Sequence, residues 1–355
     1  MVSVTMASIP FAVSILLAFF QSASSFDIEG PWDINTPVHE TLTLSSLMHS
    51  AFGADSSYTV DGAPLDIKEF FRGDMWNDDP ECQMFDEKDD DNWNFSSGTV
   101  WLSKFLAGQL GDYDEGNLIG RSHFWDLQFF HSMGAALGEQ PDDTRAKIML
   151  WLEVVYKISI EEGINGTDAI GSVPVTSVVN GTTSYQLADF FTATSTPRST
   201  DSLDALFTCS TQYQGVDIRR RAIGSCLHIV QDSFAKGHTR RELLNPEDLV
   251  AGSNRTEFVA GKYAELGAVE NFHSYVDQGS AHADADHWDA GWPAMDPAEP
   301  SSFDRLWGAR MAQEKGVQLL DFWQAGTAWG DGVEDWLLDE VFDLSPDATP
   351  SDNTV

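Results

Sequence analysis

The chain has 355 residues, of which 42% are hydrophobic and 12 are tryptophans, so it can bury a sizeable core and is not globally disordered. Its formal net charge is -36. A chain this acidic is not expected to bind duplex nucleic acid tightly and without sequence preference, because such binding depends on basic surface. A nucleic-acid substrate is not excluded, since cations bound in a cleft can reverse the local charge.

The N-terminus has the features of a secretory signal peptide. An apolar run from Ile9 to Phe20 is followed by small residues, with Ala23 and Ser25 spaced as at a cleavage site. The run is shorter than the roughly 20 residues that a membrane-spanning helix needs. We therefore expect residues 1–25 to be a signal peptide and the protein to be secreted; an uncleaved anchor is the alternative.

Export is also indicated by N-x-S/T triplets, which are the expected N-glycan sites. They are Asn94, Asn165, Asn180 and Asn254. Secretion permits one disulfide among the three cysteines, which are Cys82, Cys209 and Cys226. Cys209 with Cys226 is one pairing, but the sequence does not fix it and one thiol is left over.

Six segments carry apolar residues at helical spacing, and convincing stretches of period two are few. In chain order they are residues 38–52, 122–137, 145–163, 217–237, 256–278 and 303–323. We predict an all-α protein, with a single helical domain over residues 26–344. Two regions interrupt the helical pattern: an acidic loop at residues 79–96, and residues 163–203, a surface insertion or short hairpin. Residues 345–355 are predicted to be a disordered tail.

The segment CLHIVQDSFAKGHTRRE, residues 226–242, contains the first candidate site. His228 and Asp232 are four residues apart and therefore lie on one face of a helix. His238 follows after Gly237, which is expected to end or bend the helix. One imidazole and one carboxylate can bind a metal here, and the second imidazole can bind a neighbouring metal. For this pair alone, a hydrogen-bonded core histidine beside a solvated aspartate is the alternative.

The same spacing recurs downstream, where His273 and Asp277 lie in another segment predicted to be helical. His39 stands at the start of the first predicted helix, and His123 lies in the stretch GRSHFWDLQFF. The stretch FFRGDMWNDDPE supplies Asp74, Asp78 and Asp79. Imidazoles and carboxylates without thiolates suit Zn²⁺ in a catalytic role.

This ordered series resembles the zinc-dependent phospholipase C and single-strand-specific nuclease superfamily. The series is a histidine near the mature N-terminus, Trp-x-Asp, a histidine, His-x3-Asp-x5-His and His-x3-Asp, and it spans residues 32–277. The middle motif, His228-x3-Asp232-x5-His238, has the spacing of the family. The resemblance implies an all-α fold around three zinc ions at the bottom of a cleft.

The resemblance also assigns the ligands residue by residue. One zinc ion would be held by Asp78, His123, His228 and Asp232. A second would be held by His238, His273 and Asp277. The third would be held by His39 and the shared carboxylate of Asp232. Asp78 is also the residue that the resemblance expects to orient or deprotonate the attacking water.

Two points of this assignment stay open. His131 lies two helical turns after His123 and is either its rival or a partner that supports it. In the family, the amino group and carbonyl of an N-terminal tryptophan complete the third zinc site. Trp32 is the counterpart here, whereas signal cleavage is expected near Phe26. Either a second processing step exposes Trp32, or the third site is completed differently, or it is weak.

Secreted, zinc-dependent hydrolysis of phosphodiesters is the activity that follows. We prefer a zwitterionic phospholipid, cleaved to diacylglycerol and a phosphorylated head group, because the acidic balance disfavours polyanions and anionic bilayers. The alternative is a single-strand nuclease or nucleotidase, whose bases could stack on Trp76, Trp93, Trp125 or Trp288. A catalytically inactive zinc-binding glycoprotein is the alternative of a different class. No stable protein partner is inferred.

Two further features have competing interpretations. Arg240 and Arg241 follow His238 and either meet a substrate phosphate or neutralise carboxylates. The segment 273–289 carries Asp284, Asp286 and Asp289, which suggests Ca²⁺, although the EF-hand spacing is absent. His282 and His287 in the same segment compete with His273 as zinc ligands.

Overall fold

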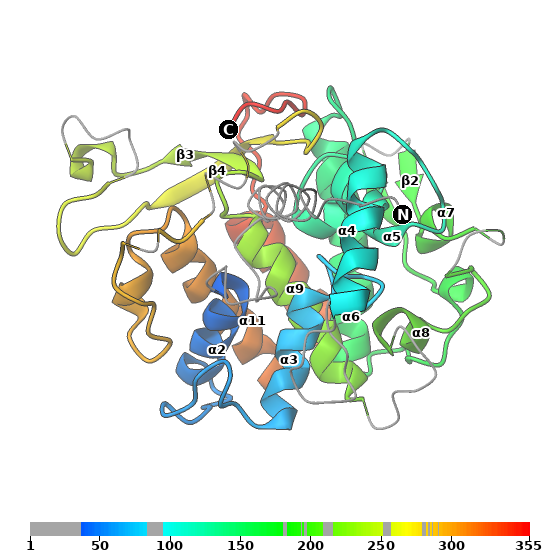
Figure 1. Cartoon of the computed structure of the whole chain (residues 1–355), viewed down its shortest axis with the longest axis horizontal. Helices are drawn as coiled ribbons and strands as arrows, with labels where there is room; N and C mark the ends of the chain where they lie inside the picture. The colour runs from blue at the N-terminus through cyan, green and yellow to red at the C-terminus, as the bar shows by residue number, and fades with distance from the viewer. Residues whose placement is uncertain are drawn as a thin grey trace, which may run out of the picture.

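The computed structural model describes residues 37–83, 95–179, 183–192, 194, 197–208, 216–250, 257–278, 282, 285, 287–289 and 291–355. Within these ranges the protein is mainly helical, with two small antiparallel sheets (Figure 1). The prediction of a helical fold is confirmed at this level. Among the described helices, none combines the length and apolarity that crossing a membrane requires.

Several predictions fall outside the described residues. They concern the signal peptide at residues 1–25, Trp32, most of the acidic loop, Trp93, the triplets at Asn94, Asn180 and Asn254, Cys209, Asp284 and Asp286. Of the four predicted glycan sites, Asn165 is described, and it is exposed.

Helix α9 (Ile218–Asp232) is the central helix of the structure (Figure 1). It begins after Asp217, whose carboxylate accepts hydrogen bonds from the backbone N–H groups of Arg219 and Arg220. From Arg221 onward every residue of α9 is buried, so polar side chains in its second half lie inside the protein. Its neighbours are α2 (Val38–His49), α3 (Leu65–Met75), α6 (Pro141–Ile160), α8 (Leu203–Thr208) and α11 (Ala309–Ala325).

Helices α3 and α9 cross at close range because each contributes a glycine to the contact. A Cβ atom on Gly73 would lie 2.1 Å from a backbone carbonyl oxygen of α9, and a Cβ atom on Gly224 would lie 2.3 Å from one of α3. Both distances are far below van der Waals contact, so only glycine permits this approach. The crossing brings Asp74 of α3, and Asp78 just after it, toward His228 of α9.

Strands β3 (Thr239–Leu243) and β4 (Leu266–Phe272) form an antiparallel pair, at the upper left in Figure 1. Thr239 pairs with Phe272 at one end of the register. The two residues just beyond that pair, His238 and His273, therefore become neighbours, and the N–H of His273 donates a 2.8 Å hydrogen bond to the carbonyl of His238.

The prediction of a helix over residues 256–278 is wrong, because β4 occupies its middle. Leu266, Val269 and Phe272 are buried at intervals of three, as on a helix face. The interval arises instead from register irregularities in the pairing with β3, which break the alternation of a regular strand. His273 and Asp277 consequently do not share a helix face.

The C-terminal residues are ordered, so the prediction of a disordered tail is also wrong. Leu344 bridges to Val269 of β4 in parallel, and the N–H of Ser345 donates to the carbonyl of Val269 at 2.9 Å. Further along, the N–H of Ser274 donates to the carbonyl of Asp352 at 2.7 Å. The tail therefore extends along the strand that leads to His273.

The remaining elements surround this centre. The helices are α4 (Phe95–Gln109), α5 (Leu118–Phe124), α7 (Leu187–Phe190) and α12 (Val333–Trp336). The short 3-10 helices are η3 (Gln128–His131), η4 (Ile170–Ser172), η5 (Pro246–Asp248), η6 (Pro300–Phe303) and η7 (Trp329–Asp331). A short π-helix, η8, spans Leu337–Val341. Strands β1 (Ser177–Val179) and β2 (Thr183–Tyr185) pair antiparallel, and they form the short hairpin anticipated within residues 163–203.

The disulfide in the structure differs from the pairing that the sequence suggested. Cys82 is disulfide-bonded, whereas Cys226 of α9 is a free and fully buried thiol. A bond between Cys209 and Cys226 is therefore excluded. Burial raises the pKa of the Cys226 thiol well above its ordinary value, so it is an inert core residue.

Candidate metal centre

Buried histidines and aspartates from distant parts of the sequence converge at the C-terminal half of α9. His39 comes from the first turn of α2, Asp78 from the turn after α3, and His131 from the end of η3. His123 comes from the last turn of α5, His228 and Asp232 from α9, and His238 from just before β3. We call these seven residues the His/Asp cluster.

One group of potential ligands consists of His39, His228 and Asp232, all fully buried. The Nε2 atom of His39 is 3.3 Å from Oδ1 of Asp232, and the Nε2 atom of His228 is 2.9 Å from Oδ2 of the same carboxylate. The imidazole rings of His39 and His228 are stacked, with centroids 4.2 Å apart. Asp232 thus offers one oxygen to each histidine, as a bridging carboxylate does.

A second group consists of Asp78, His123 and His131, which are also buried. Oδ1 of Asp78 lies 3.6 Å from Nε2 of His123 and 3.8 Å from Nδ1 of His131. His131 also joins the two groups, because its Nδ1 is 3.0 Å from Nε2 of His228 and 3.0 Å from Oδ2 of Asp232.

The distances between donor atoms test whether a metal ion fits. Ligands placed about 2.0–2.2 Å from a tetrahedral zinc ion are separated from one another by about 3.3–3.6 Å. The 3.3 Å between His39 and Asp232 and the 3.6 Å between His123 and Asp78 match this separation. Each of the two groups could therefore hold a metal ion.

Several histidines of the site are fixed through Nδ1, which leaves Nε2 for a metal. The Nδ1 atom contacts Oε1 of Gln231 at 2.5 Å in His39, the carbonyl of Ile119 at 2.8 Å in His123, and the carbonyl of His131 at 2.6 Å in His238. Carbonyl and amide oxygens only accept hydrogen bonds, so Nδ1 carries the proton and Nε2 carries the lone pair. This is the arrangement by which proteins orient metal-binding imidazoles.

Many polar atoms of the cluster are buried without a hydrogen-bond partner among the described residues. They are Asp78 Oδ2, His123 Nε2, His131 Nε2, His228 Nδ1, Asp232 Oδ1 and His238 Nε2, with Asp74 Oδ1 and His282 Nε2 beside them. Each such atom costs about 1–3 kcal/mol if it stays unsatisfied. Bound cations would satisfy them together, which is the strongest structural indication of a metal centre.

The carboxylates of the cluster are ionised despite burial. Burial by itself would raise the pKa of Asp232, but the adjacent imidazoles, above all that of His228, hold it well below its ordinary value. Burial would also raise the pKa of Asp78, and the imidazoles around it lower that pKa instead. Within the described chain the ion-pair partners of Asp74, Asp78 and Asp232 are histidines, with no lysine or arginine.

The imidazoles differ in the direction in which the protein shifts their pKa. Burial lowers the pKa of His131 to about 4 and also lowers that of His238, so both are neutral and able to bind a metal at pH 7. Burial would lower the pKa of His228 as well, but Asp232 and Asp78 raise it well above its ordinary value. A metal that binds His228 must therefore displace a proton.

The structure treats the downstream pair differently. His273 is buried, and its Nδ1 contacts Oδ1 of Asp352 in the C-terminal tail at 2.9 Å, so its Nε2 is also left for a metal. Asp277 is exposed and has a left-handed backbone, with φ of 63°. No hydrogen bond or ion pair links its carboxylate to the cluster within the described chain. His273 therefore borders the cluster, and Asp277 does not join it.

Little in the sequence indicated which residues position the ligands. Oδ2 of Asp74 accepts a 2.6 Å hydrogen bond from Thr43, and its Oδ1 faces Nδ1 of His228 at 3.4 Å. Asp74 lies one helical turn before Asp78, a spacing that could have indicated a shared face. Gln231 and Asp352 had no such signal, because their contacts join segments far apart in the chain.

The two arginines after His238 have structural roles. Arg241 is buried, lies over the ring of Phe234, and donates hydrogen bonds to the carbonyls of Ser233, Gly267 and Val341. Arg240 is partly exposed and pairs with Glu270 and Asp352. The contacts of Arg240 match the interpretation that it neutralises carboxylates, and those of Arg241 are with backbone carbonyls and an aromatic ring.

Comparison with known proteins adds nothing to this geometry: no protein-family model, curated protein or solved structure matches the chain. The geometry of the residues alone therefore supports a metal centre.

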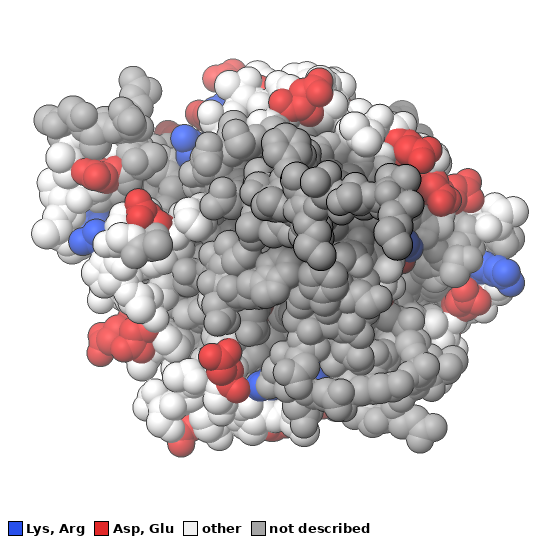
Figure 2. Space-filling model, viewed as in Figure 1, with Lys and Arg blue, Asp and Glu red and all other residues white. Residues whose placement is uncertain are grey.

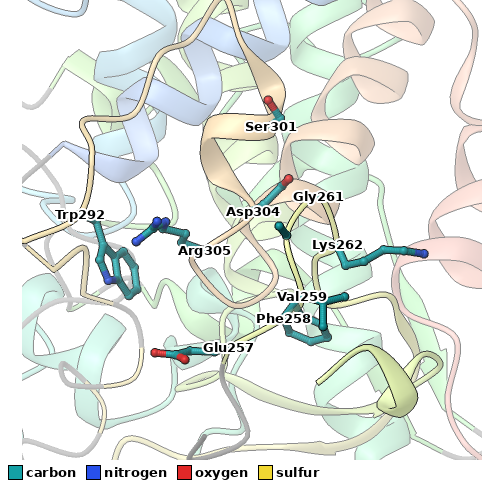
Figure 3. Close-up of a pocket in the computed structure, with 10 residues that line it drawn as sticks. Glu257, Phe258, Val259, Gly261, Lys262, Trp292, Ser301, Asp304 and Arg305 are labelled. Atoms are coloured by element: carbon teal, nitrogen blue, oxygen red, sulfur yellow. The ribbon is translucent and has the colours of Figure 1, made fainter. Parts of the chain in front are cut away.

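A surface cleft of about 490 Å³ lies apart from the cluster (Figure 3). Residues 257–262 form one side, and Ser301, Asp304 and Arg305 with Trp292 form the other. It shares no residue with the cluster, and its charged residues are of both signs.

Asp289, the described member of the proposed Ca²⁺ loop, accepts a 2.7 Å hydrogen bond from the N–H of Gly291.

Proposed function

We propose that this protein is a secreted, zinc-dependent phosphodiesterase whose active centre is the His/Asp cluster. The observation that carries the proposal is the convergence of buried imidazoles and carboxylates with unpartnered atoms, in two groups of metal-binding spacing. The two groups are in contact, because Oδ2 of Asp232 in the first lies 3.0 Å from Nδ1 of His131 in the second, and adjacent metal-binding groups are typical of sites where several metal ions act on one phosphate.

Zinc is the metal that the donors favour. The cluster supplies imidazole nitrogens and carboxylate oxygens and contains no thiolate, which excludes the ligand set of most closed structural zinc sites. Zinc ions held by these residues would activate a water molecule and neutralise the charge on the phosphodiester.

Asp78 is the residue that we assign to the proton of the attacking water. Its Oδ1 faces His123 and His131, whereas its Oδ2 has no hydrogen-bond partner among the described residues. The lowered pKa keeps the carboxylate ionised, so it can accept a hydrogen bond from water and orient it. Because Asp78 follows α3, the α3–α9 crossing fixes its position.

Neighbouring side chains position part of the cluster through hydrogen bonds. Gln231 contacts His39 and donates from its amide to Thr43, which donates to Asp74. This chain of hydrogen bonds inside the core thus holds His39 and connects it to Asp74. Rigid placement of this kind lets binding geometry contribute to the rate.

For the substrate we propose a zwitterionic phospholipid. Acidic side chains are distributed around the visible rim of the molecule, with few basic ones (Figure 2), and the chain carries a net charge of -36. Such a surface repels polyanions at neutral pH. Of the proposed base-stacking residues, Trp76 and Trp288 are buried, and Trp125 packs edge-on against Tyr113.

The test is a parallel assay of the purified secreted protein. Zinc-loaded protein is incubated with phosphatidylcholine in mixed micelles, with single-stranded DNA and with RNA, and the products are identified by mass spectrometry. Diacylglycerol and phosphocholine are the expected products, and chelation should abolish their formation.

Two variants sharpen the assay. His228→Ala should lose activity by several orders of magnitude, whereas His49→Ala, on the exposed end of α2, should retain it. Formation of 5′-nucleotides instead of diacylglycerol would replace the lipid substrate with a nucleic acid. Zinc binding without hydrolysis of any phosphodiester would show that the protein is an inactive zinc-binding glycoprotein.

A further inference from the structure

The surface cleft outside the cluster contains one unpaired charge of each sign (Figure 3). Two of its charged side chains, those of Lys262 and Asp304, form ion pairs with residues outside the cleft. Arg305 and Glu257 are exposed, and neither side chain forms a hydrogen bond or an ion pair within the described ranges. The cleft therefore has one guanidinium and one carboxylate left for a ligand.

Arg305 differs in this respect from most arginines of the chain. Most of the described arginines form an ion pair with a carboxylate, as expected in a chain with 56 acidic and 20 basic side chains. Arg305 forms none among the residues that the structure describes, although Asp304 precedes it and Glu257 lines the same cleft. An exposed guanidinium of this kind can donate two parallel hydrogen bonds to a phosphate.

Aromatic rings form the apolar part of the cleft. Trp292 is partly buried and packs against the buried Trp288, whose ring is perpendicular to it at a centroid distance of 5.0 Å. Phe258 is also partly buried, and its ring centroid lies 6.0 Å from that of Trp307. Other aromatic residues thus support both rings, and part of each side chain remains accessible to a ligand.

The unpaired charges lie on the same side of the cleft as Trp292. Figure 3 shows the guanidinium of Arg305 directed toward the ring of Trp292, with the carboxylate of Glu257 on the same side in this view. The amine of Lys262 is directed away from these groups. The cleft volume of about 490 Å³ lies within the range of roughly 300–1,000 Å³ that is usual for small-molecule sites.

These groups match a ligand that carries a phosphate and a quaternary ammonium. A tryptophan face attracts a quaternary ammonium, and a nearby carboxylate adds to the attraction. The guanidinium binds the phosphate. The net charge of -36 disfavours a ligand that is only anionic, whereas the cationic end of a zwitterion is attracted.

We propose that this cleft is an accessory binding site for a phosphocholine group. Arg305 binds its phosphate, and Trp292 and Glu257 bind its quaternary ammonium. The inference rests on the proposed function for the class of substrate, and it adds a site that contains no residue of the metal centre. Such a site holds either the head group of an intact lipid or the released head group.

The test reads the cleft by NMR in the zinc-loaded protein. The indole N–H signal of Trp292 and the Nε–H signal of Arg305 report on this cleft and not on the metal centre. Phosphocholine should shift both signals in one saturable transition. Choline should shift the signal of Trp292 alone, and inorganic phosphate that of Arg305 alone. Phosphocholine that leaves both signals unmoved overturns the proposal.

Variants separate the two ends of the ligand. Arg305→Ala should weaken phosphocholine binding, read from Trp292, about tenfold or more, and should leave choline binding unchanged. Trp292→Leu keeps an apolar side chain without a ring, so it should weaken phosphocholine binding, read from Arg305, about 3- to 30-fold. The matched control is Arg198→Ala, which removes the same charge at an exposed position outside the cleft and should bind as the wild type does.

The outcomes also separate this inference from the proposed function. Wild-type affinity for phosphocholine in Arg305→Ala overturns the inference, even where Trp292→Leu fails to fold, because Arg305 is exposed. If phosphocholine binds in the cleft but no phosphodiester is hydrolysed, the proposed function fails and the site remains. A response of both signals to phosphatidylcholine micelles supports a site for the intact lipid, and a response to phosphocholine alone supports a site for the released head group.

Discussion

A methyl group added at Gly224 should separate α3 from α9 and loosen the metal centre. The new Cβ atom would lie 2.3 Å from the carbonyl oxygen of Phe70 and 2.8 Å from the backbone nitrogen of Asp74. Ordinary contacts are about 3.5 Å, so the α3 backbone must retreat by roughly 1 Å. Both obstructing atoms are backbone, and no side chain can rotate to make room.

The magnitude follows from two opposing terms. Overpacking of this kind costs about 1–3 kcal/mol, and alanine regains about 1 kcal/mol of helix propensity over glycine. We expect Gly224→Ala to lose up to about 2 kcal/mol of unfolding free energy in the presence of chelator. The retreat also moves Asp74 and Asp78 away from His228, so zinc affinity should fall at least tenfold.

The assay combines urea unfolding with a competitive zinc titration. Gly330→Ala is the matched control, because Gly330 is exposed and a Cβ atom there would meet nothing within 4 Å. The control should stay within about 0.5 kcal/mol of the wild type. A Gly224→Ala protein with wild-type stability and zinc affinity would refute the claim that the close helix crossing positions the ligands.

Three further predictions concern the same centre. Without metal, the unfolding free energy should fall by a few kcal/mol as the pH is lowered from about 6.5 to 4. Burial lowers the pKa of His131 and His273 to about 4, so the unfolded chain binds more protons than the folded one in this window. An unfolding free energy, measured in urea, that does not change with pH would contradict this. Asp352→Ala should weaken one zinc equivalent about 10- to 100-fold by freeing Nδ1 of His273, and an unchanged titration would show that the tail plays no part. Asp232→Asn should weaken binding in both ligand groups, as read from zinc per chain, whereas loss of one ion alone would show that the carboxylate is not shared.

The parts of the site that local sequence determines were predictable. His228 and Asp232 lie four residues apart on α9 and contact each other at 2.9 Å, as the helical spacing indicated. His39 also lies at the start of a segment that was correctly expected to be helical. The helix predicted over residues 122–137 is wrong beyond His123, because α5 ends at Phe124 and only the short turn η3 follows. For α2 and α9 the periodicity of apolar residues sets the face that points inward.

The parts that depend on strand pairing were not predictable. The segment before His273 mimics a helix because its buried residues recur at intervals of three, and only its pairing with β3 reveals a strand. That pairing makes His238 and His273 neighbours and leaves Asp277 exposed. The role of Asp352 depends on where the tail docks, which its polar composition did not indicate.

The most direct test of the account is the zinc content of the folded protein, measured by elemental mass spectrometry after exhaustive dialysis. The account predicts two or more zinc ions per chain, at least one for each group of ligands, and a marked loss in His228→Ala. A folded wild-type protein that contains no stoichiometric zinc, and that takes up none when zinc is added, would contradict it.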